Sequence, residues 1–428
     1  MVSTSSRSPR VKKFVGDNGV TVLHEDNPFS RAFCIGVWVK SGSRSEAEGE
    51  EGLSHFLEHM LFKGTRKRSP LEISQSLERV GGSLDAFTTK EQICVHTQTL
   101  RDHADIAVDV LDDMFLDSVF APEQIELEKE VVLGEIRDVM DAPDDVIHDL
   151  FASEVFPGHA LGKPILGTPR SVAAFDRPAL VRFARKHLRA ENVVVSVFGS
   201  LDRKILRSVC DKAFRFRDGS PLQSSAKVGR YRPARKHHRR DLNHQHICIG
   251  GRACSYLDDK RYPLTVLTTL LGGGMSSRLF QRIREELGFA YTVYTYAESA
   301  RDSGIVVTYM AVKPGNTGAA VREVFRELEK IRRGDVGAEE LRDTKEQLKG
   351  KILLGLETSS SKMMRNARNE ICYGRQVSEK EIIDRIHRVT LDDLLESASG
   401  LLDGANNTIV SLGPSSAGLG IKRASSSR

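Results

Sequence analysis

The amino-acid sequence contains one pattern twice, and this repeat constrains the fold more than any other feature. A helical pattern leads into the β-rich run 192–199 (NVVVSVFG), and the same order recurs before 406–413 (NNTIVSLG), with Gly199 matching Gly413. Glycine, a strand-like run and an amphipathic helical stretch also recur in 81–114 and 288–328. Self-similarity at a fixed offset indicates duplicated structural units. The repeat therefore predicts two homologous domains of about 200 residues each.

Each half places strands and helices in α+β order, without strict βαβ alternation. Between the halves lies a polar, Pro/Gly/Ser-bearing and strongly basic stretch, which is typical of a linker. The predicted organisation is a disordered tail at 1–13, a first domain at 14–215, a basic linker at 216–240 and a second domain at 241–428.

Composition excludes several classes of protein. The apolar runs are shorter than the roughly 18 residues of a membrane span, so no membrane span is predicted. The 6 cysteines have no CxxC spacing and are interpreted as free thiols in a reducing compartment, which favours the cytoplasm. The first thirteen residues are Ser-rich and basic, as in a transit peptide, so the mitochondrial matrix stays an alternative.

The linker carries the run Arg235–Arg240 (RKHHRR), which raises the question of nucleic-acid binding. Tyr231 alone interleaves with these charges as a stacking partner. A solvated linker is the simpler interpretation, and no nucleic-acid partner is predicted.

The chemistry-bearing motif lies in residues 52–62 (GLSHFLEHMLF). On a helix, His55 and His59 are four apart and project from one face, so their imidazoles can converge on one ion. Glu58 stands at the edge of that face, which completes the inverted zinc-peptidase pattern H-x-x-E-H and makes Glu58 the candidate general base. The alternative is an ordinary helix whose two histidines form hydrogen bonds.

A second helix, predicted over 121–137, offers a third ligand. Glu128 and Glu135 are seven residues apart, about two helical turns, and share a face with aliphatic residues between them. Two carboxylates among aliphatic residues suit an inward-facing site better than the alternative, a solvated acidic stripe.

With these residues the sequence resembles the pitrilysin family of zinc metallopeptidases, and within it the two-domain bacterial peptidases similar to the β-subunit of the mitochondrial processing peptidase. The resemblance runs from about Lys13 to Gly413 and includes the His59 to Glu135 spacing and the flanking runs 52–54, 62–65 and 133–136. It implies that His55, His59 and Glu135 bind one Zn²⁺ per chain and that Glu58 is the base. Glu128 would support the site from behind the ligands.

The resemblance also implies substrate contacts. Residues 272–291 look like the family's second-domain signature, in which Arg284 and Tyr291 reach the substrate. Residues 83–91 resemble the strand to which a peptide adds, with Asp85, Ala86 and Phe87 in its middle. The family usually carries Asn where Asp85 stands, so only the main-chain role is carried over.

The sequence therefore predicts an α+β protein of two homologous domains, each an antiparallel-rich sheet packed with helices, enclosing a cavity. The expected activity is zinc-dependent endopeptidase cleavage of peptides or unfolded, presequence-like segments. Acidic residues around the motif and after the ligand helix favour basic peptides. The chain is expected to form a homodimer or a heterodimer with an inactive homologue. The alternative function is a non-catalytic scaffold subunit of the same fold.

Overall fold

The computed structural model describes residues 11–17, 19–201, 203–211, 213–219, 227–402 and 407–419. They form two compact units. Unit 1 comprises 1–137, 164–225 and 354–377, and unit 2 comprises 138–163, 226–353 and 378–428. Within the described ranges, none of the helices has the length and apolar character of a membrane span.

Each unit contains a mixed sheet packed with helices, which confirms the predicted two-domain α+β class. The strands are β1 (Lys12–Val15), β2 (Thr21–Glu25), β3 (Ala32–Val39), β4 (Ser83–Thr88), β5 (Ile93–Leu100), β6 (Val193–Phe198), β7 (Arg235–Arg239), β8 (Gln245–Ala253), β9 (Ala290–Ser299), β10 (Gly304–Val312) and β11 (Thr408–Gly413). The helices of the first half are α1 (Leu53–Leu61), α2 (Pro70–Glu78), α3 (Ala104–Leu116), α4 (Pro122–Asp141), α5 (Pro143–Val155), α6 (Pro169–Ala173), α7 (Arg177–His187) and α8 (Arg203–Asp211). Those of the second half are α9 (Arg261–Gly272), α10 (Thr317–Arg332), α11 (Ala338–Leu354), α12 (Ser359–Tyr373), α13 (Glu379–Arg388) and α14 (Leu391–Leu402), with a π-helix, η5, at Phe280–Glu286.

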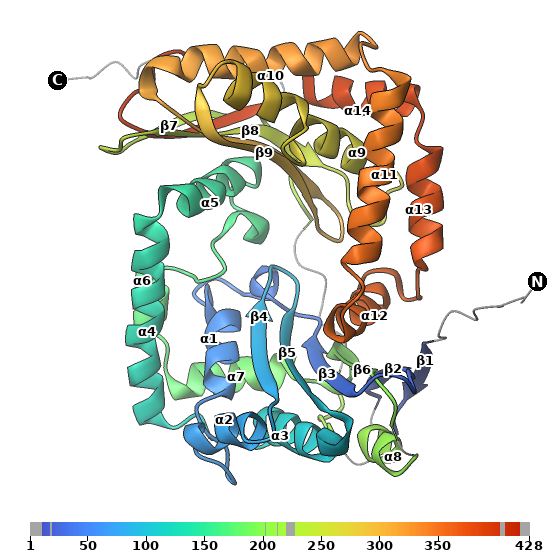
Figure 1. Cartoon of the computed structure of the whole chain (residues 1–428). Helices are drawn as coiled ribbons and strands as arrows, with labels where there is room; N and C mark the ends of the chain where they lie inside the picture. Colours follow the sequence, from blue (N-terminus) through green and yellow to red (C-terminus); the bar gives the residue numbers. More distant parts are fainter. Residues whose placement is uncertain are drawn as a thin grey trace, which may run out of the picture. The chain divides into compact units, whose positions relative to one another are not determined.

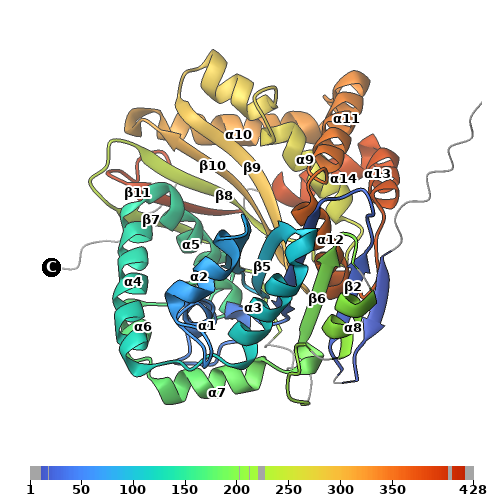
Figure 2. The ribbon, with the colours of Figure 1, turned by 60° about the horizontal axis from the view of Figure 1, so that its bottom comes forward.

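The two sheets share one pairing pattern. Unit 1 has the order β1-β2-β6-β3-β5-β4 and unit 2 the order β7-β11-β8-β10-β9 (Figure 2). The last strand of each half has one parallel and one antiparallel neighbour. Strand β6 pairs in parallel with β2 and antiparallel with β3, and β11 pairs in parallel with β7 and antiparallel with β8. These two strands are the matched runs that revealed the repeat, so the duplicated sequence corresponds to a duplicated topology.

Each unit includes a helix from the other half of the sequence (Figure 1). Helix α12 follows most of unit 2 in the chain, but it packs on β3 and β6 of unit 1. Its Met363 and Ala367 are fully buried in a cluster with Trp38 and Phe198. Helix α5 belongs to unit 2, where it packs on β8 and β11. Neither unit is therefore one continuous stretch of chain.

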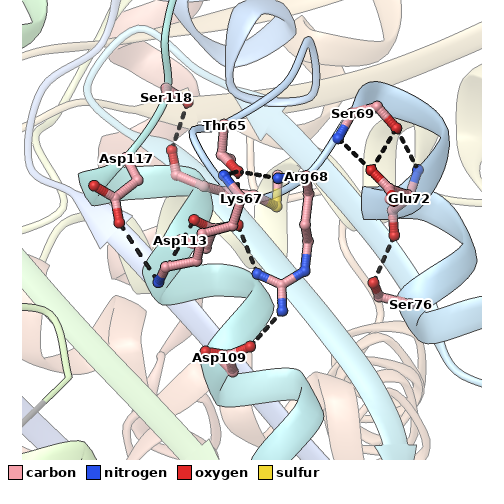
Figure 3. A network of polar contacts seen from close by, with 11 residues as sticks. Thr65, Lys67, Arg68, Ser69, Glu72, Ser76, Asp109, Asp113, Asp117 and Ser118 are labelled. Carbon is pink, nitrogen blue, oxygen red and sulfur yellow. Dashed lines mark hydrogen bonds and ion pairs between the residues drawn. The ribbon is translucent and has the colours of Figure 1, made fainter.

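A polar network fixes the loop that follows α1 (Figure 3). Arg68 donates to Asp113 on α3 at 2.6 Å and also to Asp109. Asp113 has a side-chain exposure of 0%, and the Thr65 hydroxyl donates to it at 2.7 Å. A buried carboxylate with charged and hydroxyl donors is stabilised and defines a unique loop position. The loop thereby ties α1 to α3.

Two predicted boundaries differ from the structure. Residues 1–10 of the expected tail lie outside the described residues, but Lys12 and Lys13 belong to β1, which pairs antiparallel with β2. Within the expected linker, Arg235–Arg239 forms β7, which pairs in parallel with β11. Main-chain pairing does not require apolar side chains, and charged residues are common on edge strands. Composition alone therefore does not indicate that these two segments are strands.

Buried His187 on α7 makes the stability of unit 1 sensitive to pH. Its ring stacks on Phe183 at 4.0 Å between centroids, and its Nδ1 lies 2.6 Å from Ser41 Oγ. Burial lowers the pKa of His187 from 6.5 to about 3. Between these values only the unfolded chain holds the proton, so this contribution to stability is complete above about pH 6.5 and is lost as the pH falls toward 3.

We expect His187→Gln to flatten the dependence of the unfolding free energy on pH below 6.5, by at most about 1.4 kcal/mol per pH unit. Urea titrations at pH 4 to 7 would measure it. The matched control is His244→Gln, because His244 is exposed. Equal slopes for the wild type and His187→Gln would contradict this assignment.

Candidate metal centre and active site

Helix α1 carries the histidine motif and begins under tight backbone constraints. Gly52 precedes it at φ 96°, and a Cβ there would lie 2.6 Å from the carbonyl oxygen of Leu166. The N-cap residue is a glycine and has no side chain to cap the helix. Glu46 instead accepts hydrogen bonds from the Gly52 and Ser54 amides at 2.9 and 2.8 Å. Burial raises the pKa of Glu46 to about 7, although both hydrogen bonds favour the charged form. A remote carboxylate therefore caps the motif helix.

One face of α1 is anchored in the core of unit 1 by fully buried apolar side chains (Leu53, Phe56, Leu57, Met60 and Leu61). The histidines project from the remaining surface, where the side chains of His55 and His59 are 13% and 17% exposed. Helix α4 brings Glu135 to them, with 39% of its side chain exposed. Core packing thus orients the polar face of α1.

The three predicted ligands form a compact donor group. The Nε2 atoms of His55 and His59 are 3.2 Å apart, and Glu135 Oε2 lies 3.7 and 3.6 Å from them, respectively. Ligand atoms about 2.0–2.1 Å from a common tetrahedral centre would be separated by about 3.3–3.4 Å. Two imidazole nitrogens and one carboxylate oxygen are also a donor set that suits zinc. Among the described residues this is the one group of three or more such side chains close enough to hold a metal ion.

Glu128, also on α4, lies behind His59. Its Oε1 is 2.7 Å from His59 Nδ1, and its Oε2 is 2.6 Å from Lys63 Nζ. Burial would raise the pKa of Glu128, but the hydrogen bonds with His59 and Lys63 lower it below its usual value. A carboxylate only accepts hydrogen bonds, so His59 donates from Nδ1. Its Nε2 then keeps a lone pair that can bind a metal ion together with the other two donor atoms.

Glu58 is held by the strand predicted to bind substrate. The hydroxyl of Thr88, at the end of β4, donates to Glu58 Oε2. Burial raises the pKa of Glu58 above its usual value, although this hydrogen bond favours the charged form. The charge on Glu135 contributes in the same direction as burial, so Glu58 is close enough to the donor group to respond to its field.

The two histidines have opposite electrostatic environments. Burial lowers the pKa of His55 to about 4, and His59 adds to the effect. Burial would also lower the pKa of His59, but the hydrogen bond with Glu128 and the nearby carboxylates raise it. Among the described residues, Glu128 holds Nδ1 of His59, whereas Nδ1 of His55 is buried without a hydrogen-bond partner.

Asp85, Ala86 and Phe87 lie on β4, the edge strand of the sheet in unit 1. Within the described part of the chain β4 pairs with β5 alone, so its other side can accept an added strand. Asp85 is exposed and the other two are partly buried. Their predicted contact with a substrate stays a prediction.

Arg284 and Tyr291 contact each other in unit 2. The Arg284 guanidinium lies 4.5 Å from the centre of the Tyr291 ring and 4.6 Å from that of Phe280. Arg284 is on the π-helix η5, an element that is rare and is often found at functional sites. Tyr291 is 77% exposed. The pair is assembled as a surface feature of unit 2, and its reach to a substrate stays a prediction.

Sequence reasoning assigned no role to Lys63, Thr88 or Glu46. A signal existed for Lys63, because it follows His59 by four residues, just as His59 follows His55. Thr88 had none, since its contact with Glu58 depends on how β4 packs against α1. Glu46 stands in an acidic run of the sequence, and only its hydrogen bonds in the structure show that it caps α1.

Comparison with known proteins identifies relatives along most of the chain. A family model described as "Insulinase (Peptidase family M16)" matches residues 21–169, and one described as "Peptidase M16 inactive domain" matches residues 174–348. An uncharacterized zinc protease of Bacillus subtilis is 38% identical over 387 residues, covering 89% of this chain and 93% of that protein. An uncharacterized zinc protease of Streptomyces coelicolor is 35% identical over 413 residues, covering 94% and 90%, respectively.

Solved structures show the same fold. The crystal structure of a protease from Helicobacter pylori matches with a TM-score of 0.90 at 20% identity, covering 95% of this chain and all of that chain. A structure from Pseudomonas fluorescens, titled a peptidase M16 inactive domain, matches with a TM-score of 0.87 at 17% identity, covering 95% of this chain and 98% of that chain. As the motif resemblance implied, the chain belongs to peptidase family M16, the insulinase or pitrilysin family.

Proposed function

We propose that this protein is a zinc-dependent endopeptidase. The observation that carries the proposal is the separation of 3.2–3.7 Å among the donor atoms of His55, His59 and Glu135, which fits one zinc ion. The relatives named as zinc proteases support the same metal. One zinc per chain is expected.

His55, His59 and Glu135 would hold the zinc ion, which would supply a water activated for attack, with its pKa lowered to about 7. Glu58 then takes a proton from the attacking water and passes it to the amine of the leaving peptide. Thr88 keeps the Glu58 carboxylate in one orientation for both transfers. Arg284 and Tyr291 are the groups proposed to hold the substrate backbone and stabilise the developing oxyanion.

The proposed substrates are extended peptides or unfolded, presequence-like segments. Pairing along the free side of β4 would bind them through the main chain, with little dependence on side chains. Acidic residues flank the motif in the sequence (Glu48, Glu50 and Glu51) and follow Glu135 (Asp138, Asp141, Asp144 and Asp145). Their charge supports a preference for basic peptides.

The proposal also includes a location and an assembly. The two zinc proteases named above are bacterial proteins, which favours the cytoplasm over the mitochondrial matrix. The dimer, with a second copy or an inactive homologue, stays a prediction. A single chain contains every residue that the proposed reaction uses.

Metal removal tests the proposal directly. We expect the purified chain to contain one zinc and to cleave an internal bond of an unstructured basic peptide. A chelator should lower the cleavage rate at least tenfold, and added zinc should restore it. Metal analysis and mass spectrometry of the products provide the readouts.

A scaffold subunit would bind no zinc or would leave the peptide intact, and either result would reject the enzyme assignment. Release of single terminal residues would reject only the endopeptidase assignment. An acidic peptide of matched length is the control for substrate charge. Equal, salt-independent cleavage of both peptides would remove the preference for basic substrates.

A further inference from the structure

Lys63 extends the spacing of the histidine motif by one more turn. His55, His59 and Lys63 follow one another at intervals of four residues, so they lie along one side of α1 and its C-terminal turn. The Lys63 amide donates to the Met60 carbonyl at 3.2 Å, which keeps this turn closed beyond the last helical residue. The lysine side chain therefore leaves the helix on the side that faces α4.

Glu128 links Lys63 to His59, with one oxygen for each. Oε2 lies 2.6 Å from Lys63 Nζ, and Oε1 lies 2.7 Å from His59 Nδ1. The Glu128 side chain is 4% exposed and that of Lys63 is 29% exposed. With both oxygens held, the carboxylate has a single orientation.

This ion pair differs from the surface pairs of the chain. Exposed pairs contribute little, because solvent screens them and both side chains lose freedom. A buried carboxylate without its cation is strongly unfavourable. Loss of Lys63 would therefore favour a different side-chain conformation of Glu128. His59 would then lose the acceptor that fixes its ring, and among the described residues His55 Nδ1 has no hydrogen-bond partner to compensate.

We propose that Lys63 is a positioning residue for the metal centre, acting through Glu128 on the ring of His59. Residues behind metal ligands typically change metal affinity 10- to 100-fold when they are replaced. The proposal rests on zinc as the ion of the donor group, and it assigns to Lys63 a part of the affinity for that ion.

The test measures zinc affinity without peptide hydrolysis. Lys63→Met removes the cation and keeps most of the stem, and a competing chromophoric chelator reports the dissociation constant. We expect zinc binding to weaken by about 10- to 100-fold. Lys63→Arg keeps the positive charge and should remain within a few-fold of the wild type.

Lys67→Met is the matched control. Lys67 lies in the same unit but forms its ion pairs with Asp113 and Asp117, at 3.8 and 3.6 Å (Figure 3). Its zinc affinity should equal that of the wild type. Visible absorption of the Co²⁺-loaded proteins adds a readout of ligand geometry, which should change in Lys63→Met alone.

Unchanged zinc affinity and Co²⁺ spectrum in Lys63→Met would overturn the proposal. Equal losses in Lys63→Met and Lys67→Met would do the same, because they would indicate general destabilisation. Thermal melting of the metal-free variants identifies a folding defect, and Lys63→Gln then repeats the comparison. Failure of the wild type to bind zinc would instead reject the proposed function itself.

Discussion

Replacing Glu58 with glutamine is expected to lower the rate of peptide cleavage by about 10²- to 10⁴-fold, which is the usual contribution of a general acid–base residue. Glutamine has almost the same shape, and its amide oxygen can still accept the hydrogen bond from Thr88. It cannot take a proton from water. The variant should therefore keep its fold and its zinc and lose the chemical step.

Metal analysis and single-turnover kinetics of Glu58→Gln would check this expectation. Glu126→Gln is a suitable control, because Glu126 is on the ligand helix α4 but forms an ion pair with Lys129 on its surface. Wild-type rates are expected for the control. If Glu58→Gln retained zinc and cleaved at a rate within a few-fold of the wild type, another group would have to be the base.

The second large effect concerns stability, and it arises because α12, from the second half of the sequence, packs in unit 1. Met363 on α12 is fully buried against the sheet of unit 1, in a cluster with Trp38 and Phe198. Truncating a buried methionine to alanine removes apolar contacts and leaves a cavity, at a cost of about 2–5 kcal/mol. Met363→Ala should therefore destabilise unit 1, although its residue number belongs to the second half.

Hydrogen exchange followed by mass spectrometry would locate this effect, with faster exchange expected in β3 and β6. Arg368→Ala provides the control on the same helix, since Arg368 is exposed and surface changes usually stay within about 0.5 kcal/mol. Equal exchange rates in unit 1 of Met363→Ala and the wild type would contradict the role given to α12.

Local spacing predicted which side chains of the site share a helix face, and the resemblance to the pitrilysin family then indicated Glu135 as the third ligand. An offset of four positions from His55 to His59, and of seven from Glu128 to Glu135, places each pair on one helix face whatever the rest of the chain does. The repeat depends on comparison within the chain, so it needed no tertiary information. For the same reason, the sequence alone indicates that the strands β6 and β11 are equivalent.

Features that depend on tertiary packing were not predictable in this way. The apolar face of α12 is visible in the sequence, but an amphipathic pattern does not tell which sheet the face covers. The contacts of Thr88 with Glu58 and of Lys63 with Glu128 join residues 30 and 65 positions apart. Strands β1 and β7 were missed because their stability comes from main-chain pairing and not from apolar side chains.

The exchanged helix α12 also affects how the chain folds during synthesis. Unit 1 requires residues 354–377, which leave the ribosome well after its preceding segment ends at residue 225. The 152 residues from 226 to 377 take roughly 8–30 s to make at about 5–20 residues per second. Through this interval the nascent first half lacks the cover for Trp38 and Phe198, and its apolar sheet face is open to chaperones or to aggregation. The position of one helix in the gene thus determines how long the nascent catalytic half stays unprotected.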